Sequence, residues 1–426
     1  MEYFERFADS LLKEKLEAFG GVLITGPKGC GKTTTAKQFA KDVVEFQDED
    51  KREQYLSVAN TKPSSLLIGE KPILFDEWQD APKIWGAIRK DIDDNQRIGS
   101  YILTGSSSQN IKTPHTGTGR ISTMEMLPMS LFESKESNGQ VSLSNLFNNK
   151  DSFEGCKSEL SIDNLIFSIC RGGWPESIVM KNDKKKLSIA HDIFSQICKK
   201  DIREVSKVKR KADIAKRILE SYSRHICTTA KVKTIFQDVK KEGLPRDSTL
   251  YEYINDLKAL HIIDEIESWN PPIRPKTVIR STPKRNLIDP SIAVAALGLS
   301  PKYFNRDFKT LGFLFESLCI RDLKIYSQRM GGTISYYRDR YGLNADCVLH
   351  LKDGRYALIE FKLGESEIER RAEHLCEIET LVKEYNKEEK QCPIDEPNLK
   401  IIITATHYGY KRDDGVLVIP IGCLRD

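Results

Sequence analysis

Short apolar runs alternate with amphipathic stretches over residues 1–135. Three of these runs are GVLIT at 21–25, KPILFDE at 71–77 and GSYILTGSS at 99–107. Apolar runs of this length, bounded by glycine or polar residues, are typical of buried strands in a parallel sheet, and the stretches between them have helical spacing. The pattern therefore predicts an α/β domain in this first part of the chain.

The pattern weakens between Glu133 and Asn164. This stretch contains SKESNGQ and FNNKDSFEGCKSE, and no long apolar period survives in it. Polar clusters between periodic segments are typical of loops, so we expect a flexible loop or a domain boundary here.

A helical pattern returns over 165–269. The runs AKRILESYSRHI, KVKTIFQDVKK and STLYEYINDLKAL are followed by HIIDEIES, which has the composition of a strand. Asp247 or Ser248 is the expected cap of the third helix. Helix, helix, helix and strand in this order predict a winged helix, and NPPIRP at 270–275 then interrupts the chain.

From about Phe308 the chain returns to an α/β pattern. A helix comes first, and strands such as IIITATHYG and GVLVIPI follow. The chain has room for two or three domains, and we find no internal repeat.

The run at 21–25 is followed directly by a glycine-rich turn with the pattern of a phosphate-binding loop. GPKGCGKT at 26–33 fits the phosphate-loop pattern between a strand and a helix. Backbone N–H groups of such a turn surround the β-phosphate, the lysine reaches the β- and γ-phosphates, and the hydroxyl binds Mg²⁺. We therefore expect ATP and Mg²⁺ as cofactors. The expected nucleotide-binding residues are Gly26, Pro27, Lys28, Gly29, Cys30, Gly31, Lys32, Thr33 and Thr34.

The second run ends in an acidic pair, Asp76 and Glu77. With a phosphate loop upstream, Asp76 is expected to hold Mg²⁺ together with Thr33, and Glu77 is expected to polarise the attacking water. An acidic pair on a surface loop is the alternative.

An ATPase site is also expected to contain a residue that senses the γ-phosphate and an arginine that stabilises the transition state. Thr104 or Ser106 at the end of the third run could sense the γ-phosphate, with an ordinary strand-end turn as the alternative. An arginine that meets the transition-state charge is also expected, either in the same chain or from a neighbouring subunit. Arg120 is the first candidate for it and Arg97 the second.

The composition of the chain limits the partners, metal sites and cellular location that we expect. The chain has 66 basic and 62 acidic residues and a formal net charge of +4, so its overall charge predicts neither a nucleic-acid nor a membrane partner. Ten cysteines without a C-x-x-C pair and seven histidines without ligand spacing indicate no zinc site and no disulfide framework. With no signal-like or membrane-spanning segment, we expect a cytoplasmic protein.

Several stretches together resemble a bacterial and archaeal family of AAA-type ATPases whose C-terminal part is a domain of unknown function. The resemblance covers nearly the whole chain, and it implies an AAA-like P-loop ATPase domain at 1–135, a helical and winged-helix domain at 160–285, and a restriction-endonuclease-like α/β domain at 300–426. It implies no particular cellular role. The stretches, in order, are LITGPKGCGKT, ILFDEWQDAPKIW, YILTGSSS, GRISTMEMLPMSLFE and RGGWPES.

The stretch NADCVLHLKDGRYALIEFKL resembles the D-x(n)-E-x-K core of restriction-endonuclease-like nucleases. In that chemistry Asp346 and Glu360 would hold a divalent cation, and Lys362 would stabilise the attacking hydroxide or the developing charge. Glu316 stands where this fold often adds a further acid. Asn344 departs from relatives that have an acid at this point, which weakens the case for a second metal. A solvated surface hairpin is the alternative.

Hairpin register decides whether these acids can meet. A two-residue turn at Asp353-Gly354 would put Asp346 and Glu360 on opposite faces of the sheet. A three-residue loop at 352–354, with Gly354 in the left-handed region, would place Asp346 opposite Glu360 with Lys362 on the same face. We expect the second arrangement.

Basic residues precede the expected winged helix. CKKDIREVSKVKRK at 198–211 carries seven of them, including Lys207, Lys209 and Arg210, which could grip DNA phosphates. Glu252 and Asp256 on the expected recognition helix argue against base reading. A winged helix that packs structurally on the nucleotide domain is therefore the alternative.

These features together predict an ATP-hydrolysing switch that controls the winged-helix and C-terminal domains. One alternative is an ATP-dependent DNA nuclease, and another is a nucleotide-gated scaffold that binds nucleic acid or protein without nuclease activity. The expected partners are ATP, with DNA and further copies of the chain as candidates, and no membrane.

Overall fold

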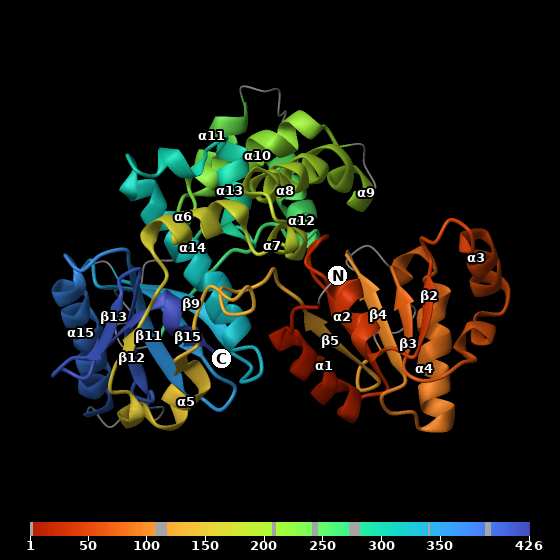
Figure 1. The fold of residues 1–426 in the computed structure, drawn as a ribbon, viewed down its shortest axis with the longest axis horizontal. Coiled ribbons are helices and arrows are strands. Elements are labelled where there is room, and N and C mark those ends of the chain that lie inside the picture. The colour runs from red at the N-terminus through yellow and green to blue at the C-terminus, as the bar shows by residue number, and fades with distance from the viewer. Residues whose placement is uncertain are drawn as a thin grey trace.

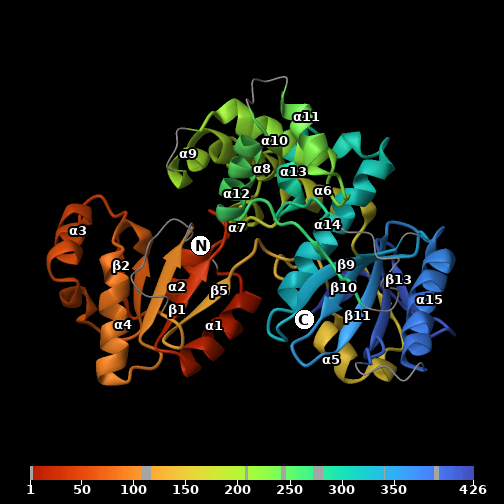
Figure 2. The ribbon, with the colours of Figure 1, turned by 180° about the vertical axis from the view of Figure 1, so that it is seen from behind.

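The computed structural model describes residues 3–106, 117–206, 210–240, 246–271, 282–339, 341–387 and 393–426. Figure 1 shows three parts: an N-terminal α/β part in red and orange, a helical middle part in green, and a C-terminal α/β part in blue. Figure 2 shows from behind that the middle part lies above the other two.

A five-stranded parallel sheet forms the centre of the N-terminal part, in the order β2-β3-β4-β1-β5. The three strands predicted from the apolar runs are confirmed as β1, β3 and β4. The strands are β1 (Gly21–Thr25), β2 (Asp42–Glu45), β3 (Ile73–Asp76), β4 (Tyr101–Gly105) and β5 (Ile121–Glu125). The helices are α1 (Phe7–Ala18), α2 (Lys32–Phe39), α3 (Arg52–Thr61) and α4 (Lys83–Asn95), with the 3₁₀ turns η1 (Pro63–Leu67) and η2 (Trp78–Asp80). Because all five strands are parallel, their carboxyl ends lie along one edge of the sheet.

Residues 133–160 correct the expectation of a flexible loop. This stretch carries β6 (Val141–Ser142), α5 (Leu143–Asn148), η3 (Lys150–Ser152) and β7 (Cys156–Lys157). β6 pairs with β15 (Leu424–Arg425), and β7 pairs with β13 (Tyr408–Lys411), so the stretch belongs to the C-terminal part. Its few apolar side chains, such as Leu143 and Leu146, are buried. The expectation of a flexible loop was wrong because the partner strands are more than 250 residues away, where no local pattern reveals them. The alternative of a domain boundary agrees with the structure, because the chain leaves the N-terminal part in this stretch.

The middle part consists mainly of helices. They are α6 (Ile162–Arg171), α7 (Pro175–Val179), α8 (Asp183–Gln196), the π-helical turn η4 (Ile197–Asp201), α9 (Ile202–Val205), α10 (Ala212–Arg224), α11 (Val232–Lys240), α12 (Asp247–Ala259) and α13 (Pro290–Leu297). The three predicted helices are confirmed as α10, α11 and α12. The residue before α12 is Arg246, which makes no side-chain cap, so the predicted caps Asp247 and Ser248 were wrong.

Short antiparallel bridges link the segment at 284–287 to residues between α10 and α11 and to residues after α12. Thr228 pairs with Arg285, Ile263 with Leu287, and Ile266 with Lys284. The predicted interruption at 270–275 lies largely outside the described residues. The winged-helix assignment of this region stays a prediction.

An eight-stranded mixed sheet forms the C-terminal part, in the order β7-β13-β14-β12-β11-β10-β9-β8. Two long helices cover its opposite faces: Leu349, Ile359 and α14 share one apolar cluster, whereas Val348, Leu358 and α15 share another. The remaining elements are β8 (Glu267–Ser268), η5 (Pro301–Tyr303), α14 (Phe308–Tyr326), β9 (Thr333–Arg338), β10 (Asn344–His350), β11 (Tyr356–Lys362), α15 (Ile368–Lys387), β12 (Leu399–Thr404), β14 (Leu417–Pro420) and η6 (Ile421–Cys423).

The β10–β11 hairpin has the register expected from its turn. His350 pairs with Tyr356 and Cys347 with Ile359. Gly354 has a φ of 92°, in the region that favours glycine, and closes the three-residue loop at 352–354. Continuing this register places Asp346 opposite Glu360, as predicted.

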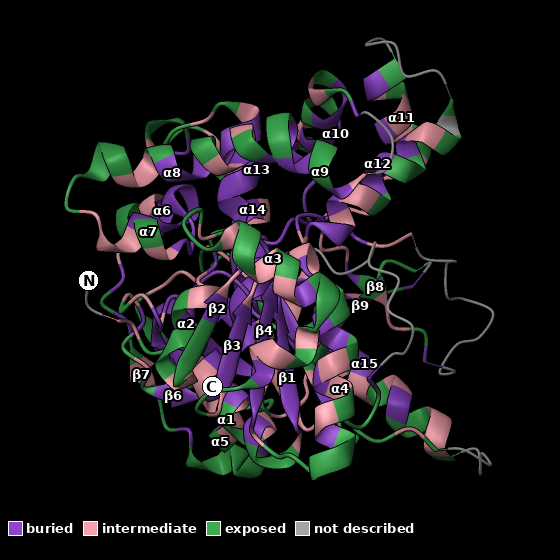
Figure 3. Cartoon of the chain, turned by 90° about the vertical axis from the view of Figure 1, so that its right-hand side faces the viewer, coloured by how far each residue is buried: buried purple, intermediate pink, exposed green. Residues whose placement is uncertain are grey.

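A close backbone crossing ties the N-terminal part to the turn between α6 and α7. The N–H of Met129 donates to the carbonyl of Gly173 over 2.6 Å. A Cβ added at Gly173 would lie only 2.1 Å from the Met129 carbonyl oxygen. Met129 and Gly173 are both buried, and Figure 3 shows buried residues in purple in helices α6 and α14.

We expect Gly173→Ala to lower the free energy of unfolding by about 3 kcal/mol, because the backbone of Met129 must shift to admit the methyl group. Thermal unfolding checks this. Gly86→Ala, on the exposed face of α4 with nothing within 4 Å of the added Cβ, is the matched control and should stabilise the protein by up to about 1 kcal/mol. Equal melting temperatures for the two variants would contradict the tight crossing.

Candidate functional site

The phosphate loop lies at the carboxyl end of β1 and leads into α2. Gly26 has a φ of 143°, and a Cβ there would lie 2.2 Å from the carbonyl oxygen of Met126. Gly29 and Gly31 also have positive φ. Cys30 is buried, and its carbonyl accepts a hydrogen bond of 2.9 Å from Arg6 Nη1. The loop is therefore held from behind by the body of the N-terminal part.

Lys32 is turned inward against this loop. Its Nζ donates to the carbonyl oxygens of Gly26 and Pro27, both at 2.9 Å. The side chain lies at the start of α2, where a helix N-terminus favours an anion. An ammonium held by two neutral carbonyls can be redirected toward phosphate oxygens, so the loop fits the triphosphate that its sequence implies.

Thr33 and Asp76 meet next to the loop. Thr33 Oγ1 donates to Asp76 Oδ1 over 2.7 Å, and the Thr104 hydroxyl donates to the same carboxylate oxygen. A hydroxyl and a carboxylate are the hard oxygen ligands that Mg²⁺ prefers. The two side chains therefore fit the implied metal.

Glu77 follows at the end of β3, with a left-handed φ of 53°. Its backbone N–H donates to Thr104 Oγ1 over 3.3 Å, and its carboxylate accepts a hydrogen bond from the Gln79 side chain. Glu77 and the buried Ser106 line one cavity of about 610 Å³ beside Lys28. The structure thus brings these predicted residues to one place. Sequence reasoning missed Gln79.

The far wall of this cavity comes from the middle part. Lys28 Nζ lies 2.7 Å from Asp201 Oδ1 and 2.9 Å from Glu204 Oε2. Burial opposes the charge on Lys28, but these two acceptors raise its pKa above the usual value. Sequence reasoning missed both acids, because more than 170 residues separate them from Lys28. We call this contact the Lys28 bridge.

An apolar cavity of about 360 Å³ adjoins the loop at Gly29. Its walls include Ile193 of α8, Ile197 of η4 and Leu260 after α12. Ligand cavities are mostly apolar with a few convergent polar groups, and this one opens beside the phosphate loop.

The structure does not bring Arg120 or Arg97 to the loop. Arg120 precedes β5, and its carbonyl accepts a hydrogen bond from the N–H of Gly21 at the start of β1. It therefore lies at the amino edge of the sheet, about 15 Å along the strand from the phosphate loop. Arg120 pairs with Asp93 at 2.7 Å, and Arg97 pairs with Asp91 at 3.1 Å. In this chain, neither arginine faces its own nucleotide site. Arg52, which sequence reasoning missed, does line the 610 Å³ cavity.

A second cluster lies in the C-terminal part, where the hairpin register brings Asp346, Glu360 and Lys362 together. Lys362 Nζ lies 3.8 Å from Asp346 Oδ2 and 3.7 Å from Glu360 Oε2. Burial and the charge of Asp346 raise the pKa of Glu360. Asn344 Nδ2 donates to Glu360 Oε1 over 3.2 Å, and Arg371 Nη1 lies 3.4 Å from Glu360 Oε2.

Lys284 of the middle part completes this cluster and was missed by the sequence analysis. Its Nζ lies 2.6 Å from Glu316 Oε1 and 3.6 Å from Asp346 Oδ1. Burial raises the pKa of Glu316 to about 7, although Lys284 opposes the rise. Burial also opposes ionisation of Asp346, but Lys284 and Lys362 hold its pKa below the usual value.

The C-terminal cluster does not fit a divalent metal as it stands. Within the described ranges, no group of three or more His, Cys, Asp or Glu side chains is arranged to hold a metal ion. The ammonium group of Lys284 lies between Glu316 and Asp346. It therefore occupies the place from which a metal ion would bind the oxygens of these two carboxylates.

The basic stretch before the expected winged helix is less exposed than its sequence suggests. The Arg210 side chain is buried, with Nη1 2.9 Å from Glu252 and Nε 2.6 Å from Asp256. These two acids therefore neutralise Arg210. Lys207 and Lys209 lie outside the described residues.

No helix among the described residues has the length and apolar character needed to cross a membrane.

Comparison with known proteins divides the chain as its structure does. Residues 19–135 match the family model of an AAA domain. Residues 162–303 and 311–424 match the models of two domains of unknown function, DUF8612 and DUF4143. Among proteins with curated functions, none matches the chain.

Several solved structures are similar to this one at low identity. A Walker-type ATPase of Pyrococcus abyssi is 13% identical over 69% of this chain and 96% of its own, with a TM-score of 0.45. RuvB of Thermotoga maritima is 17% identical over 60% of this chain and 87% of its own, with a TM-score of 0.28. The replication initiator DnaA bound to AMPPCP and single-stranded DNA is 15% identical over 61% of this chain and 89% of its own, with a TM-score of 0.28. These scores are too low to support a shared overall fold.

The family match and the loop geometry agree on the first part of the chain. The protein therefore carries an AAA-type P-loop ATPase domain at residues 19–135, followed by two domains of unknown function.

Proposed function

We propose that the protein is an ATP-driven switch, in which nucleotide binding at the phosphate loop moves the middle part and hydrolysis resets it. The Lys28 bridge is the observation that carries this proposal. One lysine of the phosphate loop holds two acids of the middle part, and these acids line the same cavity as Glu77. Phosphates in this cavity would compete for Lys28 and repel Asp201 and Glu204.

Each residue of the loop has a role in this proposal. The N–H groups of 26–34 surround the phosphates, and Lys32 neutralises their charge. Thr33 and Asp76 would hold Mg²⁺, which when bound supplies charge that stabilises the phosphate oxygens. Glu77 orients and polarises the attacking water, with Gln79 fixing its carboxylate. Ser106 faces the same cavity and is our candidate for sensing the γ-phosphate.

The arginine that meets the transition-state charge remains to be assigned. The position of Arg120 at the opposite edge of the sheet favours action on a neighbouring copy of the chain. Arg52 lies in the cavity and is the candidate within the same chain.

The adenine base is expected to enter the apolar cavity beside Gly29. An apolar wall from Ile193, Ile197 and Leu260 suits a flat aromatic ring. Because these residues belong to the middle part, this placement would give the middle part a direct contact with the nucleotide.

The Lys28 bridge can be tested by hydrogen exchange. We expect Lys28→Met to speed amide exchange in 197–205 about fivefold in the absence of nucleotide, because an ion pair of this kind contributes about 1 kcal/mol. Lys37→Met is the matched control: Lys37 lies 2.6 Å from Glu45 with similar exposure, but both residues belong to the N-terminal part. Unchanged exchange in 197–205 after Lys28→Met would contradict the bridge as the link between the two parts.

A DNA nuclease is the second candidate function. Asp346, Glu360 and Lys362 lie together on one face of the sheet, which favours a nuclease. The position of Lys284 between Glu316 and Asp346 argues against one. Metal-dependent cleavage of DNA by the full chain that is lost in Asp346→Ala would establish this function. A scaffold that binds nucleic acid or protein without cleavage would keep ATP turnover and show no cleavage in either form.

A further inference from the structure

Lys284 is fixed in the C-terminal cluster by its own backbone. It forms an antiparallel bridge with Ile266, in which the N–H of Lys284 donates to the Ile266 carbonyl over 2.9 Å and the N–H of Ile266 donates back over 3.1 Å. The side chain is only 10% exposed. A lysine of the middle part is thus held inside the C-terminal part.

Three oxygens of the C-terminal part surround its ammonium group. Nζ lies 2.6 Å from Glu316 Oε1 and 3.1 Å from the main-chain carbonyl oxygen of Asp346. It lies 3.6 Å from Asp346 Oδ1. A lysine ammonium has three donors and no acceptor, and here these oxygens on α14 and β10 surround it.

The same oxygens are the ones a divalent cation would need. Mg²⁺ and Ca²⁺ bind carboxylate and carbonyl oxygens, and a carboxylate from each of two elements with a main-chain carbonyl is a usual ligand set. The ammonium and a metal ion cannot share this place, because like charges at such a distance repel strongly in a buried site. Lys362 and Arg371 add further positive charge on the Glu360 side.

We propose that Lys284 is a built-in cation that excludes divalent metal from the oxygens of Glu316 and Asp346. The site becomes able to bind metal only when Lys284 leaves it, which requires the bridged segment at 284–287 to move relative to the C-terminal sheet. This goes beyond the ATP switch and does not depend on ATP turnover. The middle part, which supplies Lys284, would thereby prevent the C-terminal part from binding a metal ion.

Terbium luminescence offers a direct test with the full chain and no nucleotide. The Tyr336 ring centre lies 5.4 Å from Lys284 Nζ, so a terbium ion in place of the ammonium would be sensitised by tyrosine excitation. We expect Lys284→Ala to bind terbium at least tenfold more tightly than wild type, and to lose this gain in the double variant with Asp346→Asn. Lys324→Met is the matched control, because Lys324 also links the C-terminal part to the middle part through Asp264 but lies outside the cluster. It should gain nothing.

Terbium binding by these variants distinguishes a site blocked by Lys284 from a site that Lys284 does not block. A folded Lys284→Ala protein without a terbium gain overturns the proposal. If Lys284→Ala does not fold, as judged by circular dichroism, wild type and Asp346→Asn still decide: the proposal requires the two to bind terbium equally, and weaker binding by Asp346→Asn overturns it. ATP turnover of the wild type, measured separately, tests the switch, so failure of one proposal is not failure of the other.

Discussion

Replacing Lys32 with alanine is expected to lower ATP turnover by at least about a hundredfold, the usual loss when one charge-stabilising donor is removed from an active site. In this chain the Lys32 ammonium is held 2.9 Å from the carbonyl oxygens of Gly26 and Pro27. Lys28 is not expected to replace it, because Lys28 is one of the variable positions of the phosphate-loop pattern, whereas Lys32 is the lysine of that pattern which reaches the β- and γ-phosphates.

Phosphate release from ATP is the measurement, with Lys37→Ala as the control. Lys37 also lies on α2, but it is half exposed and pairs with Glu45. Its replacement should leave turnover within about twofold. Near-normal turnover in Lys32→Ala would contradict the phosphate-loop assignment.

Glu77→Gln is expected to separate binding from hydrolysis. The amide keeps the shape of the side chain and still accepts the hydrogen bond from Gln79, but it cannot take a proton from water. Turnover should fall about 10²- to 10⁴-fold, the range of a general base, whereas ATP binding, measured with a fluorescent analogue, should change little.

Asp80→Asn tests whether any acid of the cavity would have the same effect. Asp80 lines the same cavity and pairs with Arg52 at 3.2 Å. It should cost far less turnover than Glu77→Gln. Loss of ATP binding in Glu77→Gln as large as in Lys32→Ala would mean that Glu77 has another role.

Local patterns were enough for the nucleotide domain. Its strands are short apolar runs, and the loop at 26–33 combines glycines at fixed spacing with a lysine and a threonine, so spacing alone indicated the candidate nucleotide site. The hairpin register could also be predicted, because the position of Gly354 in the turn decides which residues face each other. Such features depend on neighbours in the sequence.

Features that depend on distant neighbours were missed. The stretch 133–160 has too few apolar residues to predict β6 and β7, which form only because β13 and β15 supply the hydrogen bonds. Lys284 and Asp201 were not identified as site residues for the same reason, because their partners are far away in the sequence. The sequence analysis placed Glu252 and Asp256 on the third helix but did not predict that they pair with Arg210, which is buried.

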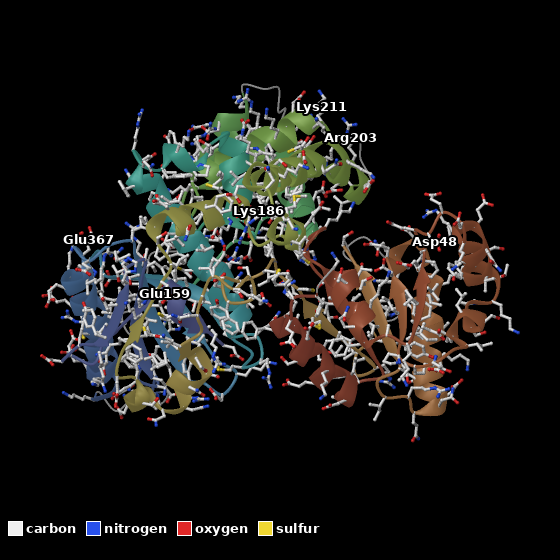
Figure 4. All side chains as sticks on the ribbon, in the orientation of Figure 1. Asp48, Glu159, Lys186, Arg203, Lys211 and Glu367 are labelled. Carbon is white, nitrogen blue, oxygen red and sulfur yellow. The ribbon has the colours of Figure 1, made fainter. Side chains whose placement is uncertain are left out.

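The movement of the middle part is the central claim, and a distance measurement tests it. Exposed positions on either side of the cavity are Glu49, next to Asp48, and Arg203 in α9. Figure 4 labels Asp48 on the N-terminal part and Arg203 on the middle part. Because the chain has ten cysteines, spin labels are best attached through a genetically encoded ketone amino acid at these two positions.

Double electron–electron resonance would compare the nucleotide-free, ADP-bound and ATP-bound states in the Glu77→Gln background, which holds ATP unhydrolysed. The account predicts that ATP shifts the distance distribution by several ångströms to longer values, because phosphates displace Asp201 and Glu204 from Lys28, and that ADP leaves it close to the nucleotide-free distribution. The same distribution in all three states, with ATP binding demonstrated in the same samples, would contradict the switch.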